Sequence, residues 1–154
     1  MRALVQKVSK ASVSINGETI GAIDLGLVVL IGVSKTDDEA DARYLVEKVS
    51  NLRIFADDTN HFNLSSLDIK AELLVVSQFT LYGDTRKGRR PDFNRAASSD
   101  DARRLYECTV SMFQETGLKV ATGRFQEHMV ISLQNDGPVT LILDSSDRQK
   151  PRRG

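Results

Sequence analysis

The stretch Leu133-Gln134-Asn135-Asp136-Gly137-Pro138-Val139-Thr140-Leu141 sets a Gly-Pro dipeptide between two apolar, strand-like runs. Proline has no N–H for a sheet ladder, and the glycine before it keeps unusual backbone angles open. An X-Pro bond is also the peptide linkage at which the cis form costs little. Taken alone, such a stretch is most often a hairpin turn, so any special role depends on what else the chain carries.

A second stretch, Ser77-Gln78-Phe79-Thr80-Leu81, ends another apolar run, Leu73-Leu74-Val75-Val76. We expect one strand over residues 72–82, in which Gln78, Thr80 and Tyr82 share a face. Polar groups at the end of a buried strand need hydrogen-bond partners or a cavity. The alternative is a strand end that emerges into solvent.

The composition is that of one globular domain. The chain has 154 residues, of which 40% are hydrophobic and 27% charged, and its 21 basic and 21 acidic side chains cancel. No overall field therefore attracts a nucleic acid, and any contact with RNA must come from a local patch. We expect a single domain over residues 1–145 and a basic, disordered tail over residues 146–154.

Several classes of protein are disfavoured by the residues present. The single cysteine, Cys108, allows no internal disulfide and fits a reducing compartment. Neither a signal peptide nor an apolar stretch of about 20 residues is apparent, so we expect a cytoplasmic protein without membrane contact. Neither HxxH, CxxC nor an acidic cluster at ligand spacing is present, so we expect no metal and no cofactor.

Apolar periodicity predicts an α+β fold, with a mostly antiparallel or mixed sheet and two main helices. The first helix is opened by a capping box at Thr36-Asp37-Asp38-Glu39 and ends near Leu52. A long loop over residues 83–99 precedes the second helix, which runs from Ser98 to about Thr116. The predicted strands cover residues 2–9, 11–15, 18–23, 26–33, 72–82, 129–133 and 139–143, with a hairpin turn at Asn16-Gly17.

The two opening stretches, SQFTL and NDGPVT, resemble the signature motifs of the D-aminoacyl-tRNA deacylases, homodimeric enzymes that remove D-amino acids mischarged onto tRNA. The resemblance extends from Met1 to about Leu143, which makes it far more specific than either motif alone. It implies the barrel-like deacylase fold. Further similar segments occur in the same order: Met1–Val8, Ala11–Val13, Leu52–Phe55, Arg90–Phe93 and Thr122–Phe125.

The resemblance also implies roles for particular residues. Ser77, Gln78, Phe79 and Thr80 would form the catalytic floor. Gly137 and Pro138, with Asn135, would reach into the active site of the other subunit, where a cis Gly-Pro bond presents carbonyl oxygens to the substrate α-ammonium. An L side chain would then collide with backbone, whereas D-aminoacyl esters and Gly-tRNA would be accepted.

The attacking group stays open at this stage. Neither a Ser/His/Asp nor a Cys/His set is visible, and His61 and His128 lie outside both motifs. Thr80 would need an activating base to act as the nucleophile. Positioning and a few backbone donors near Phe79 and Thr80 could suffice, with water or the ribose 2′-hydroxyl as the attacking group.

Local charge predicts the RNA contact. Arg86, Lys87, Arg89 and Arg90 lie in the long loop directly after SQFTL, whereas the basic tail is more typical of a solvated surface. Members of the family usually carry arginine at Lys7, and lysine lacks the planar fork. Two alternatives remain: a nucleic-acid-binding module without catalysis, and a deacylase that edits a mischarged L-amino acid.

Overall fold

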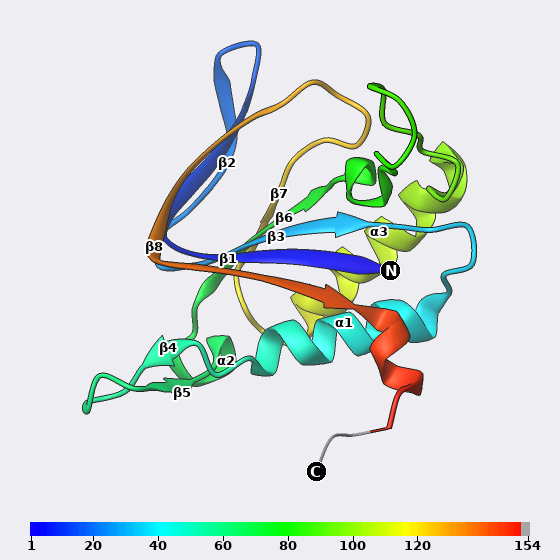
Figure 1. Ribbon diagram of the computed structural model, residues 1–154. Coiled ribbons are helices and arrows are strands. Elements are labelled where there is room, and N and C mark those ends of the chain that lie inside the picture. Colours follow the sequence, from blue (N-terminus) through cyan, green and yellow to red (C-terminus); the bar gives the residue numbers. More distant parts are fainter. Residues whose placement is uncertain (152–154) are drawn as a thin grey trace.

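A six-stranded mixed sheet curls into a nearly closed barrel at the centre of the computed structural model, which describes residues 1–151 (Figure 1). The order is β2-β1-β3-β6-β7, and β8 pairs with the other edge of β1. Pairs within β1, β2, β3 and β8 are antiparallel, whereas β3-β6 and β6-β7 are parallel. The strands are β1 (Arg2–Ile15), β2 (Glu18–Ile23), β3 (Gly26–Gly32), β6 (Glu72–Ser77), β7 (Val120–Thr122) and β8 (Val130–Asp144).

Two long helices pack against the sheet and against each other, so the predicted α+β fold is confirmed. These are α1 (Glu39–Asn51) and α3 (Ser99–Glu115), and they bury Leu45, Val49 and Phe113 completely. No helix in the described range is long and apolar enough to span a membrane. Shorter elements absent from the prediction are β4 (Phe55–Ala56), β5 (Phe62–Leu64), α2 (Ser66–Ile69) and β7.

The cap of α1 differs from the predicted capping box. Asp38, rather than Thr36, is the N-cap, and its carboxylate accepts from the Asp41 N–H while Asp41 accepts from the Asp38 N–H. Aspartate is as good an N-cap as threonine, so composition alone left the start ambiguous. The α3 cap is as predicted, since the Ser98 hydroxyl accepts from the Asp101 N–H.

The predicted strand over residues 72–82 is too long. β6 ends at Ser77, and Phe79–Tyr82 forms a short 3-10 helix, η1, so Gln78, Thr80 and Tyr82 do not share a strand face. The reason lies in the neighbouring strand. β3 ends at Gly32, so the parallel ladder has no partner beyond the Ile31–Ser77 pair.

The two late strands predicted over 129–133 and 139–143 are one strand, β8, which continues through the Gly-Pro dipeptide. It is held by β1, which pairs with residues of β8 on both sides of the dipeptide. A hairpin at this position would have folded β8 back on itself. The 14-residue length of β1 instead keeps the chain extended.

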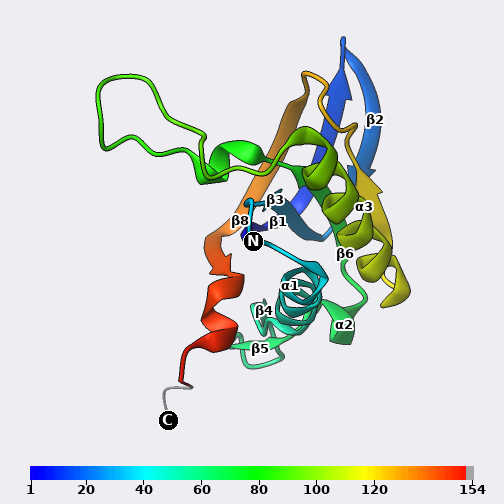
Figure 2. The same ribbon diagram turned by 90° about the vertical axis from the view of Figure 1, so that its right-hand side faces the viewer.

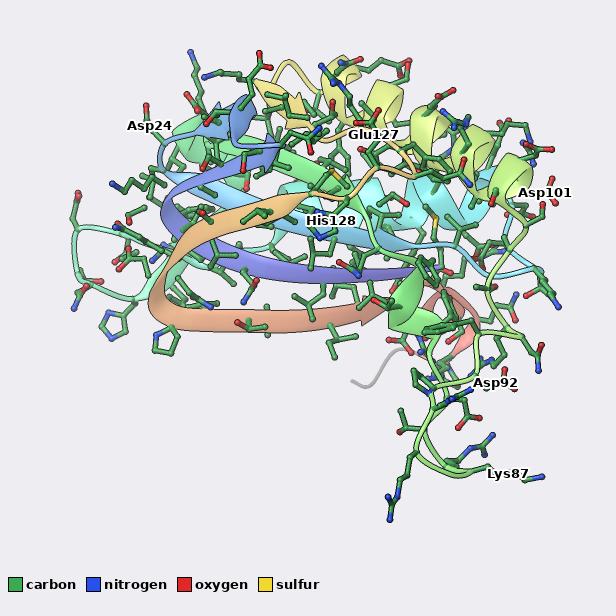
Figure 3. The ribbon with its side chains drawn as sticks, turned by 90° about the horizontal axis from the view of Figure 1, so that it is seen from above. Asp24, Lys87, Asp92, Asp101, Glu127 and His128 are labelled. Atoms are coloured by element: carbon green, nitrogen blue, oxygen red, sulfur yellow. The ribbon has the colours of Figure 1, made fainter. Side chains whose placement is uncertain are left out.

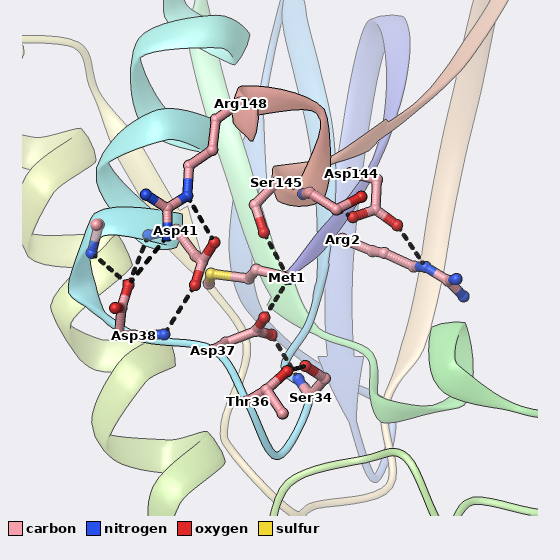
Figure 4. A network of polar contacts seen from close by, with 12 residues as sticks. Met1, Arg2, Ser34, Thr36, Asp37, Asp38, Asp41, Asp144, Ser145 and Arg148 are labelled. Atoms are coloured by element: carbon pink, nitrogen blue, oxygen red, sulfur yellow. Dashed lines mark hydrogen bonds and ion pairs between the residues drawn. The ribbon is translucent and has the colours of Figure 1, made fainter. Parts of the chain in front are cut away.

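The chain beyond Asp144 is more ordered than predicted, because Ser145–Gln149 forms a second 3-10 helix, η2. The α-ammonium of Met1 donates to Asp37 and to the Ser145 hydroxyl, at 2.7 Å for the latter (Figure 4). Arg148 donates to the buried Asp41 carboxylate over 3.2 Å. These contacts fasten the C-terminal segment to α1 and the N-terminus to Asp37, just before α1. The predicted tail cations Arg152 and Arg153 lie outside the described residues.

Candidate active site

A cavity of about 560 Å³ opens beside the end of β6. Ser77, Gln78 and Phe79 form one wall, and the connection from Phe125 to Met129 forms another. His128, which is labelled in Figure 3, therefore lines the same cavity as the SQFTL motif, although in the sequence it lies outside both motifs. Nothing local in residues 125–129 signals this position, because β7 brings the segment there through its pairing with β6.

The η1 turn presents two unused backbone donors. The Gln78 N–H donates to the Ile31 carbonyl over 2.7 Å, and the Leu81 N–H donates back to the Gln78 carbonyl over 3.2 Å. Within residues 1–151 the N–H groups of Phe79 and Thr80 have no acceptor. Two adjacent free donors beside a cavity can stabilise a developing oxyanion.

Among residues 1–151, the hydroxyl of Thr80 has no base as a hydrogen-bond partner. Its partner among the described side chains is Gln78, whose amide donates to it. Thr80 is exposed and lies beside the cavity rather than among its lining residues. In the described part of the chain, no group of three or more His, Cys, Asp or Glu side chains is placed to hold a metal ion.

Gly32 lets η1 pack closely on the end of β3, a role that the sequence pattern did not predict. A Cβ at this position would lie 3.0 Å from the Leu81 Cβ, 3.2 Å from the Gln78 carbonyl oxygen and 3.3 Å from the Tyr82 ring. These distances leave no room for a larger residue without shifting the turn. Gly32 therefore determines how near η1 can approach the sheet.

Gly137 and Pro138 lie in a bulge of β8. Gln6 pairs with Thr140 and Val8 pairs with Asn135, so Lys7 alone faces the four residues of β8 between them. The Gly137-Pro138 bond is cis, and Gly137 has φ of 141°. Both residues are exposed, whereas the following Val139 is buried in the main core and anchors the bulge.

Asn135 holds the bulge from within its own chain. Its amide oxygen accepts from the Val139 N–H over 2.8 Å, and its amide nitrogen donates to the Thr140 hydroxyl over 2.8 Å. Both ends of the side chain are therefore engaged across the base of the bulge. Asn135 therefore shapes the Gly-Pro segment, and its role in binding the substrate stays a prediction.

Lys7 braces the same bulge. Its ammonium lies 4.0 Å from the Asp136 carboxylate, and 5.7 and 5.8 Å from the ring centres of Phe55 and Phe62. Only 12% of the Lys7 side chain is exposed. A cation between two rings and a carboxylate is well restrained, so the β4–β5 hairpin supports the Gly-Pro segment through Lys7.

Replacement of Lys7 by methionine is expected to lower turnover at this site several-fold, because the bulge loses its ionic contact while the packed stem is kept. The free energy of unfolding should fall by no more than about 1 kcal/mol, since Asp136 stays hydrated. Lys7→Arg should retain full activity, because its guanidinium reaches the carboxylate with two donors. Steady-state kinetics of both variants tests this, and equal activity of Lys7→Met and the parent would refute the brace.

The two motifs lie apart within one chain. Lys7 of β1 lies opposite the bulge and pairs with Leu27 of β3, which in turn pairs with Leu73 of β6. The bulge is therefore level with Leu73, whereas Ser77 lies four residues further along β6. Four strand residues span about 13 Å, and β1 and β3 separate β8 from β6. Figure 1 shows the bend of β8 and the coil after β6 at opposite ends of the sheet. One chain alone therefore cannot bring Gly137 to Phe79.

The basic loop after η1 projects from the body of the molecule (Figures 2 and 3). Its base is closed by reciprocal hydrogen bonds between the backbones of Asp84 and Asp92, at 2.7 and 2.8 Å. The Arg86 side chain and backbone N–H lower the pKa of the Asp84 carboxyl to about 2. Within the described chain, Lys87, Arg89 and Arg90 are exposed and form no ion pair.

Comparison with known proteins places the chain first in a class and then in a family. Relatives named D-aminoacyl-tRNA deacylase, which are hydrolases, match almost its entire length. One from Dehalococcoides mccartyi (strain ATCC BAA-2266 / KCTC 15142 / 195) is 54% identical and covers 99% of this chain and 100% of the relative. One from Desulforamulus reducens is 57% identical, and the match covers 94% of this chain and 97% of the relative. The model of the D-Tyr-tRNA(Tyr) deacylase family matches residues 4–144. The chain belongs to this family.

Two solved structures have the same fold as this chain over most of its length. One named c-Myc DNA Unwinding Element Binding Protein superimposes with a TM-score of 0.88 at 39% identity, covering 94% of this chain and 98% of the other. Another, of a probable eukaryotic D-amino acid tRNA deacylase, has a TM-score of 0.82 at 18% identity and covers 93% and 98%. At that identity the second likeness concerns the fold alone.

Proposed function

We propose that the chain hydrolyses the ester bond of D-aminoacyl-tRNA, releasing the D-amino acid and the tRNA. The observation that carries the proposal is the η1 turn, where two N–H groups without an acceptor in the described chain lie beside a cavity walled by Ser77, Gln78 and Phe79. Family membership supplies the substrate class. The cavity volume of about 560 Å³ accommodates an aminoacyl group with part of its nucleoside.

The N–H groups of Phe79 and Thr80 bind the ester carbonyl oxygen and stabilise the negative charge that develops when it is attacked. Gln78 and Thr80 are linked to each other and shape the floor. Because the Thr80 hydroxyl contacts no base, the attacking oxygen comes from water or from the ribose 2′-hydroxyl. Placement of the ester against fixed donors is then the main source of rate enhancement.

Chirality is selected by Gly137 and Pro138 of a second subunit. Their carbonyl oxygens accept hydrogen bonds from the substrate α-ammonium, so the ammonium and the ester are both held. The side chain of an L-residue would then point into the backbone of the bulge. Glycine has no side chain to collide, so Gly-tRNA is a second substrate.

A homodimer follows from this arrangement. The two motifs cannot meet within one chain, and a two-fold interface supplies each site with the other subunit's bulge. The outer edge of β8 supports the proposal, because it is unpaired along the described chain. It exposes Val130 at 55% and Ile142 at 69%. Exposed apolar edge strands are usually covered by a partner.

Release of amino acid from D-Tyr-tRNA, L-Tyr-tRNA and Gly-tRNA tests the function. Rapid loss of the D-ester and the Gly-ester, with the L-ester intact, is the expected result. Inertness of all three would refute hydrolysis. Cleavage of the L-ester would refute the chiral filter and favour a deacylase that edits L-amino acids.

The projecting loop contacts the tRNA backbone. Replacement of Lys87, Arg89 and Arg90 by alanine is expected to raise KM. It should also reduce the slope of log affinity against log salt by about two to three, because each of the three phosphate contacts contributes somewhat less than one unit. The value of kcat should stay unchanged, since these side chains project away from the cavity. Replacement of the exposed Arg43 and Lys48 of α1 is the control, because it removes cations that lie outside the loop. An unaltered salt dependence would refute the contact.

A second candidate function is binding of DNA. It is favoured by the same loop and by the likeness, at 39% identity, to a solved structure named as a DNA-unwinding-element binding protein. Titration of labelled duplex DNA with the parent chain and with the triple loop variant distinguishes DNA binding from action on tRNA alone. Loop-dependent affinity for DNA comparable to that for tRNA would support it as a further activity.

A further inference from the structure

Arg2 connects the start of β1 to the η1 turn. Its Nη1 donates to the Leu81 carbonyl oxygen over 2.8 Å, and its Nε donates to the Asp144 carboxylate over 3.1 Å. Figure 4 shows the contact with Asp144, which lies where β8 ends. One guanidinium thus joins two sheet strands to the turn that carries the free N–H groups.

The Tyr82 ring completes this arrangement. The guanidinium carbon of Arg2 lies 4.6 Å from the ring centre, and that of Arg95 lies 5.6 Å from it. Tyr82 is only 4% exposed, and burial, followed by the nearby Asp37, raises its pKa to about 12. The ring therefore stays neutral and is a permanent surface for the guanidinium.

The turn needs support from outside itself. η1 has four residues, and its internal bonds leave the Leu81 carbonyl to Arg2. Isolated 3-10 segments of this length have little stability of their own. On the opposite side Phe79 is 55% exposed and Thr80 is exposed too. That side keeps one ring contact, between Phe79 and Phe93, whereas the face toward Arg2 and Gly32 is held by a hydrogen bond to the Leu81 carbonyl and by close packing.

We propose that Arg2 is a positioning residue for deacylation, which holds η1 so that the Phe79 and Thr80 N–H groups meet the ester carbonyl. The inference rests on the proposed function, because it takes η1 as the turn that binds the ester. Displacement of a catalytic group by about 1 Å can cost about 100-fold in rate. Loss of the Leu81 contact would permit such a displacement.

The geometry requires arginine. Two donors on one planar group point in different directions, one to a carboxylate and one to a carbonyl, while the plane covers a ring. Lysine has a compact ammonium on a flexible stem and cannot keep all three contacts. Asp144 orients the guanidinium of Arg2. Burial acts to raise the pKa of the Asp144 carboxyl, but hydrogen bonds from the Ser146 N–H and from Arg2 hold this pKa below its usual value.

The test compares Arg2→Lys and Arg2→Met with the parent on D-Tyr-tRNA. Both should lower kcat about 10- to 100-fold with KM changed less than about twofold, because the loop and cavity that bind tRNA are untouched. Asp144→Asn should give a smaller loss of kcat, since the Leu81 contact remains. Lys119→Met is the matched control; it removes an ion pair with Glu72 at 3.1 Å, far from η1, and should leave kcat unchanged.

Unchanged kcat in Arg2→Lys would overturn the inference, and this variant keeps the charge in case Arg2→Met does not fold. The inference would also be overturned if kcat of the Arg2 variants fell only in proportion to their melting temperature, with no loss beyond that of Lys119→Met. Phe79→Pro separates the role of Arg2 from the proposed function. If that variant is fully active, η1 is not the catalytic turn and both proposals fall; if only the Arg2 variants are fully active, this inference alone falls.

Discussion

Gly137→Ala is expected to lower hydrolysis of D-Tyr-tRNA about 10- to 100-fold, because a shifted catalytic group loses rate steeply with distance. Gly137 has φ of 141°, a backbone conformation that L side chains rarely adopt. A Cβ there would lie 2.7 Å from the Val139 Cγ2 and 3.1 Å from the Val139 nitrogen. Val139 is buried, so the bulge rather than the core has to move.

Discrimination against L-Tyr-tRNA should weaken in the same variant, because the displaced carbonyl groups no longer fix the α-ammonium. Amino-acid release from matched D- and L-esters measures both effects. Gly17→Ala is the matched control, since Gly17 also has positive φ, 80°, but nothing within 4 Å of its added Cβ. Normal D-hydrolysis together with normal L-rejection in Gly137→Ala would contradict the proposed filter.

Phe79→Pro is expected to reduce kcat by about 100- to 1,000-fold, the usual cost of losing one oxyanion donor. Proline removes the Phe79 N–H, and its fixed φ suits the first residue of a helical turn. Gln78 before it has φ of −143° and ψ of 80°, which lies outside the α region that a following proline disfavours. Phe79→Ala is the control, because it loses the same ring and the same contact with Phe93 but keeps the N–H.

Thr80→Ala separates the roles at the neighbouring position. The variant keeps its backbone donor and loses a hydroxyl that contacts no base, so turnover should weaken without disappearing. A rate at the uncatalysed background would instead identify Thr80 as the nucleophile. Equal activity of Phe79→Pro and Phe79→Ala would show that the Phe79 N–H is not the donor.

Mixing the two disabled variants tests the shared site. A heterodimer of Phe79→Pro with Gly137→Ala holds one site with both residues intact and one with both altered. Random exchange between two-fold dimers should restore about a quarter of the sites. Activity of the mixture that equals the average of the separate variants would mean that each chain forms its site alone.

The sequence by itself determined the secondary structure wherever local rules decide it. Alternating apolar residues predicted most of β1, although as two strands, the Asn16-Gly17 hairpin signal predicted β2, and a continuous apolar run predicted β3. Helical spacing with the Ser98 cap predicted α3. The two motifs sufficed to recognise the family before any contact was known. These signals are contained within short segments, so no tertiary information was needed to interpret them.

The tertiary structure alone decided how the site is assembled. Residues 78–82 turn because β3 ends beside them, and β8 stays extended through Gly137-Pro138 because β1 is long enough to hold both halves. Phe125–Met129 reach the cavity through the pairing of β7 with β6, and Arg2 meets Leu81 across 79 residues of chain. Each depends on where a partner strand begins or ends, which is a non-local property that no pattern within a segment contains.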